Sequence, residues 1–234
     1  MTTAPSPTST HEEHTDIFKL WKDPASALTH FAGFLAALVG LPFLLINSPG
    51  GNLKTWTITL YGLSLILLFF SSATYHFFDL GPRRNLWLRR LDHSAIFLLI
   101  SGTYLPAVMH TLTGGWRLGM LITLGTLTVL GVLFKLTWFH CPRWLDALIY
   151  LAMGWSVVIP GARLLSPLSE ESLFWIVAGG VFYSVGAITY ALKKPDPWPG
   201  VFGFHEVWHL FVLAGAGSHF IFVYSMLNTP ITPF

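Results

Sequence analysis

Residues 56–75 read WTITLYGLSLILLFFSSATY and carry no charged side chain. A helix needs about 20 apolar residues to cross a hydrocarbon core about 30 Å thick, so this stretch has the length and composition of one transmembrane helix. The rest of the chain is similar, because 53% of its 234 residues are hydrophobic and 10% are charged, against about 25% charged in soluble domains. These proportions predict an integral membrane protein.

Stretches of this kind recur along the chain and predict an all-α membrane protein with seven transmembrane helices. They cover Ala27–Ile46, Trp56–Tyr75, Ser94–Val108, Leu118–Phe134, Leu145–Leu164, Leu173–Leu192 and Val207–Met226. The third stretch is short and must extend through Asp92 or Thr111 to span the membrane. Pro160 lies inside the fifth stretch, where its missing backbone N–H is expected to kink the helix.

The distribution of Lys and Arg predicts how the chain is oriented. The side of the membrane that holds the N-terminus carries ten of them: Lys19, Lys22, Arg83, Arg84, Arg89, Arg90, Lys135, Arg143, Lys193 and Lys194. The other side carries only Lys54, Arg117 and Arg163. Because cytoplasmic loops carry the excess of basic residues, the N-terminus is predicted to be cytoplasmic and the C-terminus external.

The two ends of the predicted membrane domain are set by composition. Residues 1–22 are rich in Ser, Thr and Pro and are expected to form a disordered cytoplasmic tail, followed by the seven-helix domain at residues 23–227. Acidic residues near the N-terminus do not fit the basic start of a cleavable signal peptide. The single cysteine, Cys141, excludes a disulfide within the chain.

Two histidines, His205 and His209, lie four residues apart at the start of the last apolar stretch. This spacing places both imidazoles on one face of a helix, from which both can reach one metal ion. Titratable side chains in a segment that enters lipid are costly and mark functional sites. The alternative is a pair of interfacial histidines that hydrogen-bond to loop carbonyls.

Further polar residues are predicted at the same membrane depth. In the predicted topology, Ser72 and His76 end the second helix at the cytoplasmic side, where Asp92 begins the third and the histidine pair begins the seventh. Three histidines at one depth favour a metal-ligand set of His76, His205 and His209 over scattered structural histidines. We interpret the remaining histidines as structural or solvated, with His30 bridging helices: His11, His14, His30, His93, His110, His140 and His219.

Two of these polar residues have structural alternatives. Ser72 can hydrogen-bond to the carbonyl one turn earlier in its own helix, as serines in membrane helices often do. Asp92 can form an interfacial salt bridge with Arg89 or Arg90. Both alternatives compete with roles in a metal site.

Four motifs carry a family resemblance: SATYH at 72–76, LDHSAI at 91–96, GTYLP at 102–106 and HEVWH at 205–209. Residues 20–227 resemble the hemolysin III family, the bacterial branch of the progestin and adipoQ receptor (PAQR) superfamily, which is more distantly related to alkaline ceramidases. The resemblance implies a multi-pass protein of the bacterial inner membrane. It also implies Zn²⁺ bound by His76, His205 and His209, with Asp92 holding a zinc-bound water and Ser72 nearby.

This ligand set predicts hydrolytic chemistry at a zinc ion. Three histidines leave one open position on a tetrahedral zinc, which is the arrangement of catalytic sites, and zinc lowers the pKa of bound water to about 7. Asp92 would act as general base and Ser72 would donate a hydrogen bond to the ligand or an oxyanion. We therefore expect zinc-dependent hydrolysis of a lipid amide or ester at the inner leaflet, with membrane lipids and not nucleic acid as partners.

Non-enzymatic functions remain open at this stage. The resemblance also implies an alternative, a sensor in membrane-fluidity homeostasis in which a structural zinc holds helices together. A ligand receptor is disfavoured by the short outside loops, and the cytolysin implied by the family name is disfavoured because seven apolar spans do not suit a secreted, water-soluble pore former. The sequence does not separate the hydrolase from the zinc-stabilised sensor.

Overall fold

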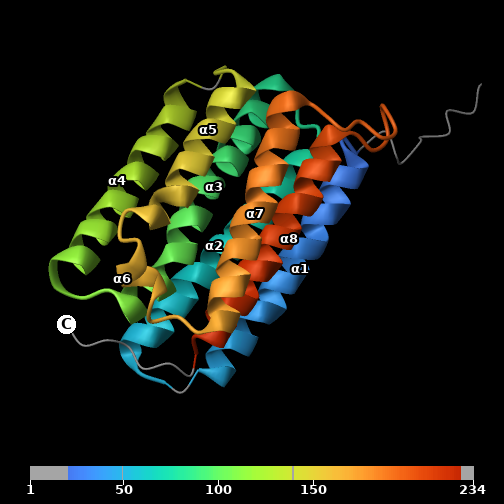
Figure 1. Cartoon of the computed structure of the whole chain (residues 1–234). Coiled ribbons are helices and arrows are strands. Elements are labelled where there is room, and N and C mark those ends of the chain that lie inside the picture. Colours follow the sequence, from blue (N-terminus) through green and yellow to red (C-terminus); the bar gives the residue numbers. More distant parts are fainter. Residues whose placement is uncertain (1–20, 49, 139, 228–234) are drawn as a thin grey trace, which may run out of the picture.

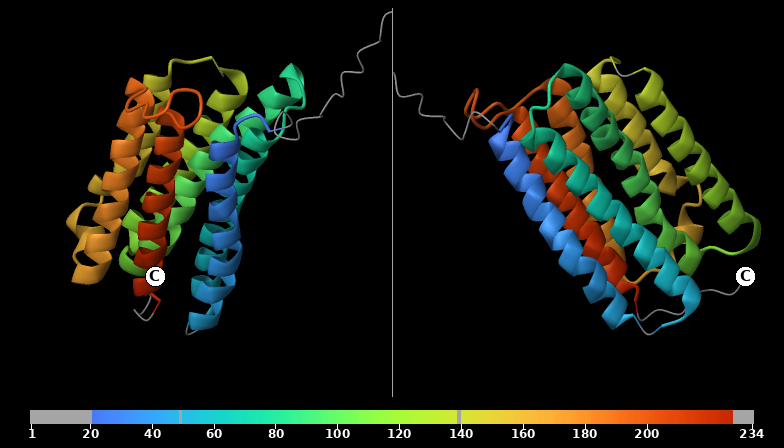
Figure 2. Two further views of the ribbon diagram at one scale, coloured as in Figure 1. Left: turned by 90° about the vertical axis from the view of Figure 1, so that its right-hand side faces the viewer. Right: turned by 180° about the vertical axis from the view of Figure 1, so that it is seen from behind.

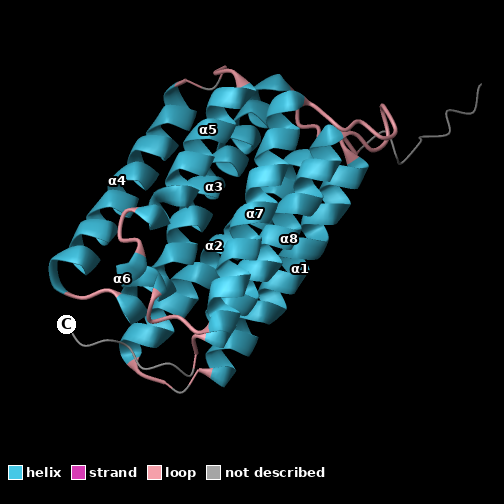
Figure 3. Ribbon diagram, in the orientation of Figure 1, coloured by secondary structure: helices cyan, strands magenta, loops and turns pink. Residues whose placement is uncertain are grey.

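The regular structure of the protein is helical. The computed structural model describes residues 21–48, 50–138 and 140–227, and within these ranges it contains helices and isolated bridges but no strand (Figures 1 and 3). The elements are α1 (Pro24–Asn47), α2 (Asn52–Phe77), α3 (Pro82–Thr111), α4 (Gly114–Thr137), α5 (Arg143–Gly154), the 3₁₀ helix η2 (Trp155–Val158), α6 (Ala162–Leu165), α7 (Glu170–Leu192) and α8 (Phe204–Ser225). The predicted all-α class is confirmed.

Six helices of the described chain are long and apolar enough to cross a membrane: α1, α2, α3, α4, α7 and α8. Each corresponds to one of the predicted stretches, and α8 ends one residue before the predicted Met226. Helix α3 runs from Pro82 to Thr111, so the short third stretch is extended through Asp92 at one end and through Thr111 at the other. The prediction of a multi-pass membrane protein is confirmed, while the membrane orientation of the bundle stays a prediction.

The fifth predicted span is not one long helix. Helix α5 ends at Gly154 after 12 residues, and η2 and a turn precede the short α6. The hydroxyl of Tyr104, on α3, donates to the Gly154 carbonyl at 2.5 Å and accepts from the Val157 backbone N–H at 2.7 Å. A side chain of α3 thus hydrogen-bonds to the backbone at the break. Pro160 follows the break, so the expected kinked helix is corrected to an interrupted one.

The long helices form a bundle in which chain neighbours pack side by side (Figures 1 and 2). Helix α7 packs on α8, α1 on α2, and α2 on α3, while α4 packs mainly on α3 at the edge of the bundle. Small residues bring α7 and α8 close together, because a Cβ added at Gly179 would lie 2.2 Å from the His219 ring. The described core includes fully buried side chains from several helices, such as Ile58, Phe97, Leu164 and Phe222.

A buried polar cluster joins α4 to α5. Lys135 is fully buried and its ammonium forms an ion pair and hydrogen bond with Asp146. The Cys141 thiol donates to the same carboxylate at 2.7 Å. Burial and this neighbouring Asp146 carboxylate raise the pKa of the Cys141 thiol. The His93 ring lies 3.9 Å from the other Asp146 oxygen, and its structural role stays a prediction.

The start of α1, the end of α2 and the start of α8 lie at one end of the bundle (Figure 2). Trp21 and Phe78 form an isolated antiparallel bridge, and the Asp23 N–H donates to the His76 carbonyl at 3.0 Å. The Ser26 hydroxyl donates to Glu206 at 2.6 Å, which ties α1 to α8. Residues 1–20 of the predicted tail lie outside the described residues. Trp21 and Lys22 take part in the contacts at this end of the bundle.

Candidate metal centre

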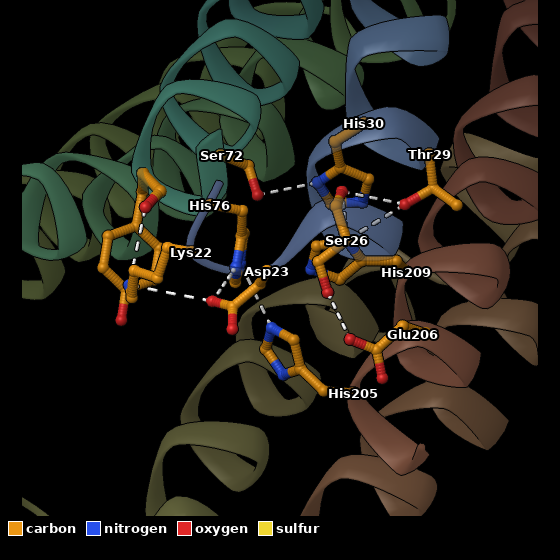
Figure 4. Close-up of polar contacts among 11 residues, drawn as sticks. Lys22, Asp23, Ser26, Thr29, His30, Ser72, His76, His205, Glu206 and His209 are labelled. Carbon is orange, nitrogen blue, oxygen red and sulfur yellow. Dashed lines mark hydrogen bonds and ion pairs between the residues drawn. The ribbon is translucent and has the colours of Figure 1, made fainter. Parts of the chain in front are cut away.

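Three histidine side chains converge at this end of the bundle (Figure 4). His76 comes from the last turn of α2, and His205 and His209 come from the first turns of α8. One ring nitrogen from each lies within 4.8 Å of the other two. His76 and His209 are buried and His205 is partly buried. The predicted grouping of these three residues is therefore present in the structure.

The spacing of the ring nitrogens fits a metal ion. The Nε2 atoms of His76 and His205 lie 3.2 Å apart. Nitrogens bound at 2.0–2.1 Å to a tetrahedral zinc lie roughly 3.3 Å from one another. The imidazole donors and the spacing of this pair therefore fit zinc, and His209 offers a third nitrogen within 4.8 Å of the other two.

Ser72 and Asp92, the two residues predicted to assist the metal, lie beside the histidine cluster. Ser72 is buried one turn before His76, and a hydrogen bond of 2.7 Å joins its hydroxyl to the His30 Nδ1 atom. Asp92 is buried and interacts with both Ser72 and His76. The Asp92 carboxylate is not part of the group of donor atoms within 4.8 Å of one another.

His30 on α1 directly contacts residues of the candidate site in addition to bridging helices. Its ring stacks on the His209 ring with centroids 3.6 Å apart and an angle of 8° between the planes. Together with the hydrogen bond to Ser72, this contact links α1 to both α2 and α8. The expected bridging by hydrogen bonding is confirmed. By contrast, His219 is bonded to the Ile176 carbonyl, away from the cluster.

One residue at the site, Asp23, is absent from the sequence-based prediction. The His76 Nδ1–H donates to the Asp23 carboxylate at 2.9 Å, and this hydrogen bond lowers the pKa of Asp23, although partial burial opposes the shift. Asp23 lies 53 residues from His76 in sequence. The only local signal is an acidic residue directly before an apolar helix, which is also the common pattern of a helix N-cap.

A cavity of about 260 Å³ extends from the metal centre into the bundle. Ser72, Asp92, His205 and His209 line it at the end of the bundle that holds the metal centre. Most of its other lining residues are apolar or aromatic and come from α3, α5, α7 and α8, among them Ile96, Leu99, Tyr183, Val212 and Phe222. His219 also lines it, ten residues after His209 on α8, so the cavity runs about 15 Å along this helix.

Comparison with known proteins agrees with this architecture. A family model described as "Haemolysin-III related" matches residues 18–220. The chain is 33% identical over 210 residues to a "Hemolysin-3 homolog" of Bacillus subtilis (strain 168), covering 88% of this chain and 95% of the relative. It is 36% identical over 205 residues to "Hemolysin-3" of Bacillus cereus, covering 85% and 89% of the two chains.

A more distant similarity extends to a eukaryotic receptor. The chain is 27% identical over 247 residues to the "Adiponectin receptor protein" of Drosophila melanogaster, which covers 93% of this chain and 55% of the relative. This similarity supports the predicted placement of the hemolysin III proteins within the PAQR superfamily. From the family model and the two bacillus relatives together, the chain belongs to the hemolysin III family of multi-pass membrane proteins.

Proposed function

We propose that the protein is a zinc-dependent hydrolase that cleaves an amide or ester bond of a membrane lipid. The observation that carries this proposal is the position of three histidine nitrogens, within 4.8 Å of one another, at one end of a largely apolar cavity. Ser72 and Asp92 lie at the same end. A polar reaction centre and an apolar binding space therefore adjoin each other, as the cleavage of a lipid requires.

His76, His205 and His209 would hold the metal and leave its fourth position open. When bound, zinc supplies Lewis-acid activation of water or of a carbonyl group near neutral pH. Asp92 would orient the attacking water and accept its proton as general base. Ser72 would donate a hydrogen bond to the carbonyl oxygen of the substrate, where negative charge develops in the transition state.

The apolar part of the cavity supports a lipid chain as the group that is bound. A depth of about 15 Å along α8 accommodates most of an extended acyl chain. Binding sites of this kind are lined mainly by apolar side chains and have a few polar groups that fix orientation. The relatedness of the family to alkaline ceramidases, noted from the motifs, favours an amide over an ester by analogy.

The proposed location of the reaction is the inner leaflet of the bacterial cell membrane. Ten of the 13 Lys and Arg residues belong to the side that holds the N-terminus. Helix α1 begins at the same end of the bundle as the metal centre. With the N-terminus in the cytoplasm, substrate would reach the centre from the cytoplasmic leaflet.

The test is release of free fatty acid by the purified protein in nanodiscs that contain ceramide-like amides or ester lipids. Wild type should release fatty acid in a zinc-dependent manner. His205→Ala and His209→Ala should lose most of the zinc, because two imidazoles do not replace three. Asp92→Asn should keep the zinc and lose turnover by roughly 10²-fold or more, the scale of a general base.

Asp79→Asn is the matched control for the loss of a carboxylate. Asp79 follows α2 at the same end of the bundle, is exposed, and accepts hydrogen bonds from the Gly81 N–H and from the Asn85 amide in the first turn of α3. Its variant should keep both zinc and turnover. If wild type releases no fatty acid from any lipid of the panel, the hydrolase proposal is wrong.

A membrane sensor with a structural zinc is the second candidate. The histidine cluster joins the end of α2 to the start of α8, whereas α8 otherwise packs on α7, α1 and α3. A metal there would couple the packing of α2 and α8 directly. This candidate gains if Asp92→Asn loses zinc as completely as the histidine variants do, since Asp92 would then close the site as a fourth ligand.

A further inference from the structure

The first turns of α1 supply hydrogen-bond acceptors to two of the three histidines (Figure 4). The Asp23 carboxylate lies 2.9 Å from the Nδ1 atom of His76. The Ser26 backbone carbonyl lies 3.3 Å from the Nδ1 atom of His209. In both rings the contact is to Nδ1, so the Nε2 atom on the other side of the ring remains available.

These acceptors select one tautomer of each ring. A neutral imidazole has one N–H donor and one nitrogen with a free lone pair. An ionised carboxylate and a backbone carbonyl can only accept, so these hydrogen bonds form when Nδ1 carries the hydrogen. The Thr29 hydroxyl, 3.4 Å from the His209 Nδ1, donates to the Ser26 carbonyl and can accept from the same ring hydrogen. The lone pair is then on Nε2, and for His76 this atom faces the His205 Nε2 at 3.2 Å.

We propose that Asp23 is a positioning residue that holds His76 in the tautomer and orientation that bind metal, while the Ser26 carbonyl does the same for His209. The proposal rests on the zinc centre of the proposed function. It assigns to the start of α1 a role in metal binding, although α1 contributes no ligand. Partners of this kind typically change metal affinity by 10- to 100-fold when they are removed.

The usual structural role of an acid at this position does not explain Asp23. The residue occupies the N-cap of α1, but its side chain makes no capping hydrogen bond to the helix. The side chain is 42% exposed, so burial does not force it toward His76 either. The contacts of the carboxylate are to His76 and, at 3.8 Å, to the Lys22 ammonium.

The backbone holds Asp23 in register with His76. The Asp23 N–H donates to the His76 carbonyl at 3.0 Å, and the Lys22 N–H donates to the Phe77 carbonyl at 3.4 Å. The Lys22 ammonium also lies 3.3 Å from the centre of the Tyr75 ring. Asp23 therefore contacts His76 through both its backbone N–H and its carboxylate.

The Ser26 carbonyl is held in a comparable way. The Ser26 hydroxyl donates to one oxygen of Glu206 at 2.6 Å, and the other oxygen of Glu206 accepts from the Gly203 N–H at 2.8 Å. Glu206 thus joins the start of α1 to the first turn of α8, where His209 follows one turn later. The two helix starts form one support for the histidine rings.

The experiment measures zinc affinity by chelator competition on the full-length protein in nanodiscs. Asp23→Ala should weaken zinc binding by about 10- to 100-fold. Asp23→Asn should lose less, because the amide oxygen can still accept from His76 Nδ1–H without the negative charge. Asp79→Ala, which removes an exposed acid from the same end of the bundle, should bind zinc within twofold of wild type.

A second readout reports the geometry of the site. With Co²⁺ in place of zinc, wild type should show the strong visible absorption of a tetrahedral site, and Asp23→Ala should shift or weaken this band. Unchanged affinity and unchanged Co²⁺ absorption in a folded Asp23→Ala, or in Asp23→Asn if the alanine variant does not fold, would overturn the proposal. A wild type that binds no metal would overturn the zinc centre as well, so the two failures are distinct.

Discussion

His30 contacts both a candidate metal ligand, His209, and the proposed hydrogen-bond donor, Ser72. It hydrogen-bonds to Ser72 and stacks face to face on the metal-ligand candidate His209. The hydrogen bond fixes the Ser72 hydroxyl, whose alternative is a bond to its own helix. The stacking limits the rotation of the His209 ring. We expect these two contacts to be separable by mutation.

His30→Phe should keep the ring stack and remove the hydrogen bond to Ser72. Zinc content should therefore remain near one per chain, whereas lipid hydrolysis should fall about as far as in Ser72→Ala. Because both changes remove the same hydrogen bond, the double variant should be little worse than either single one. Turnover and metal content of the three variants check this, and additive losses in the double variant would contradict the shared role.

At the scale of the elements, the interruption of the fifth predicted span depends on Tyr104. Its hydroxyl serves one backbone donor and one backbone acceptor where α5 gives way to η2. Gly154 is exposed and Val157 is half-buried, but both belong to the fifth predicted membrane span, where water is not available to satisfy them. The break also borders the cavity, because Gly154, Trp155 and Val157 line it. An uninterrupted helix would place different side chains along this wall.

Tyr104→Phe should destabilise the protein, because it removes the hydrogen bonds of the hydroxyl to the Gly154 carbonyl and the Val157 N–H. The expected loss in the free energy of unfolding is about 1–3 kcal/mol. Tyr224→Phe, at an exposed tyrosine of α8, is the matched control and should stay within about 0.5 kcal/mol of wild type. Unfolding by titration with a denaturing detergent measures both; equal stabilities would show that the break does not depend on the hydroxyl.

In the whole molecule, the distribution of Lys and Arg and the arrangement of the helices together predict that the metal centre lies at the level of the cytoplasmic leaflet. The centre lies at the end where α1 begins and α8 begins. The loop between α7 and α8, with Lys193 and Lys194, lies at this end as well. A cytoplasmic position of this end follows from the excess of basic residues on its side.

A reporter that is active only in the cytoplasm should therefore be silent when it is fused after Phe234. The same reporter fused after Lys194, between α7 and α8, should be active and serves as the matched control. Both results follow from the ten-to-three distribution of basic residues. Activity of the C-terminal fusion would reverse the orientation and would move the proposed reaction to the outer leaflet.

Much of the architecture follows from local sequence alone. A run of about 20 apolar residues has few alternatives to a membrane helix, because every backbone polar group in lipid must be paired within the segment. Six predicted stretches are long helices in the structure for this reason. The grouping of His205 and His209 is also local, since their spacing sets one helix face. His76 joins them because its helix ends at the end of the bundle where theirs begins.

Other features were decided by tertiary contacts. Asp23 and His76 are 53 residues apart, and the Tyr104 hydroxyl acts on a backbone 50 residues away, so no local pattern reports either contact. The shape of the cavity likewise depends on how helices from both halves of the chain pack. Apolar length and helical periodicity are properties of one segment, so they predict the six long helices and the histidine set without knowledge of the packing. Hydrogen bonds between distant segments depend on packing, so the break after α5, the cavity and the partners of the histidine rings follow from the folded arrangement of the helices.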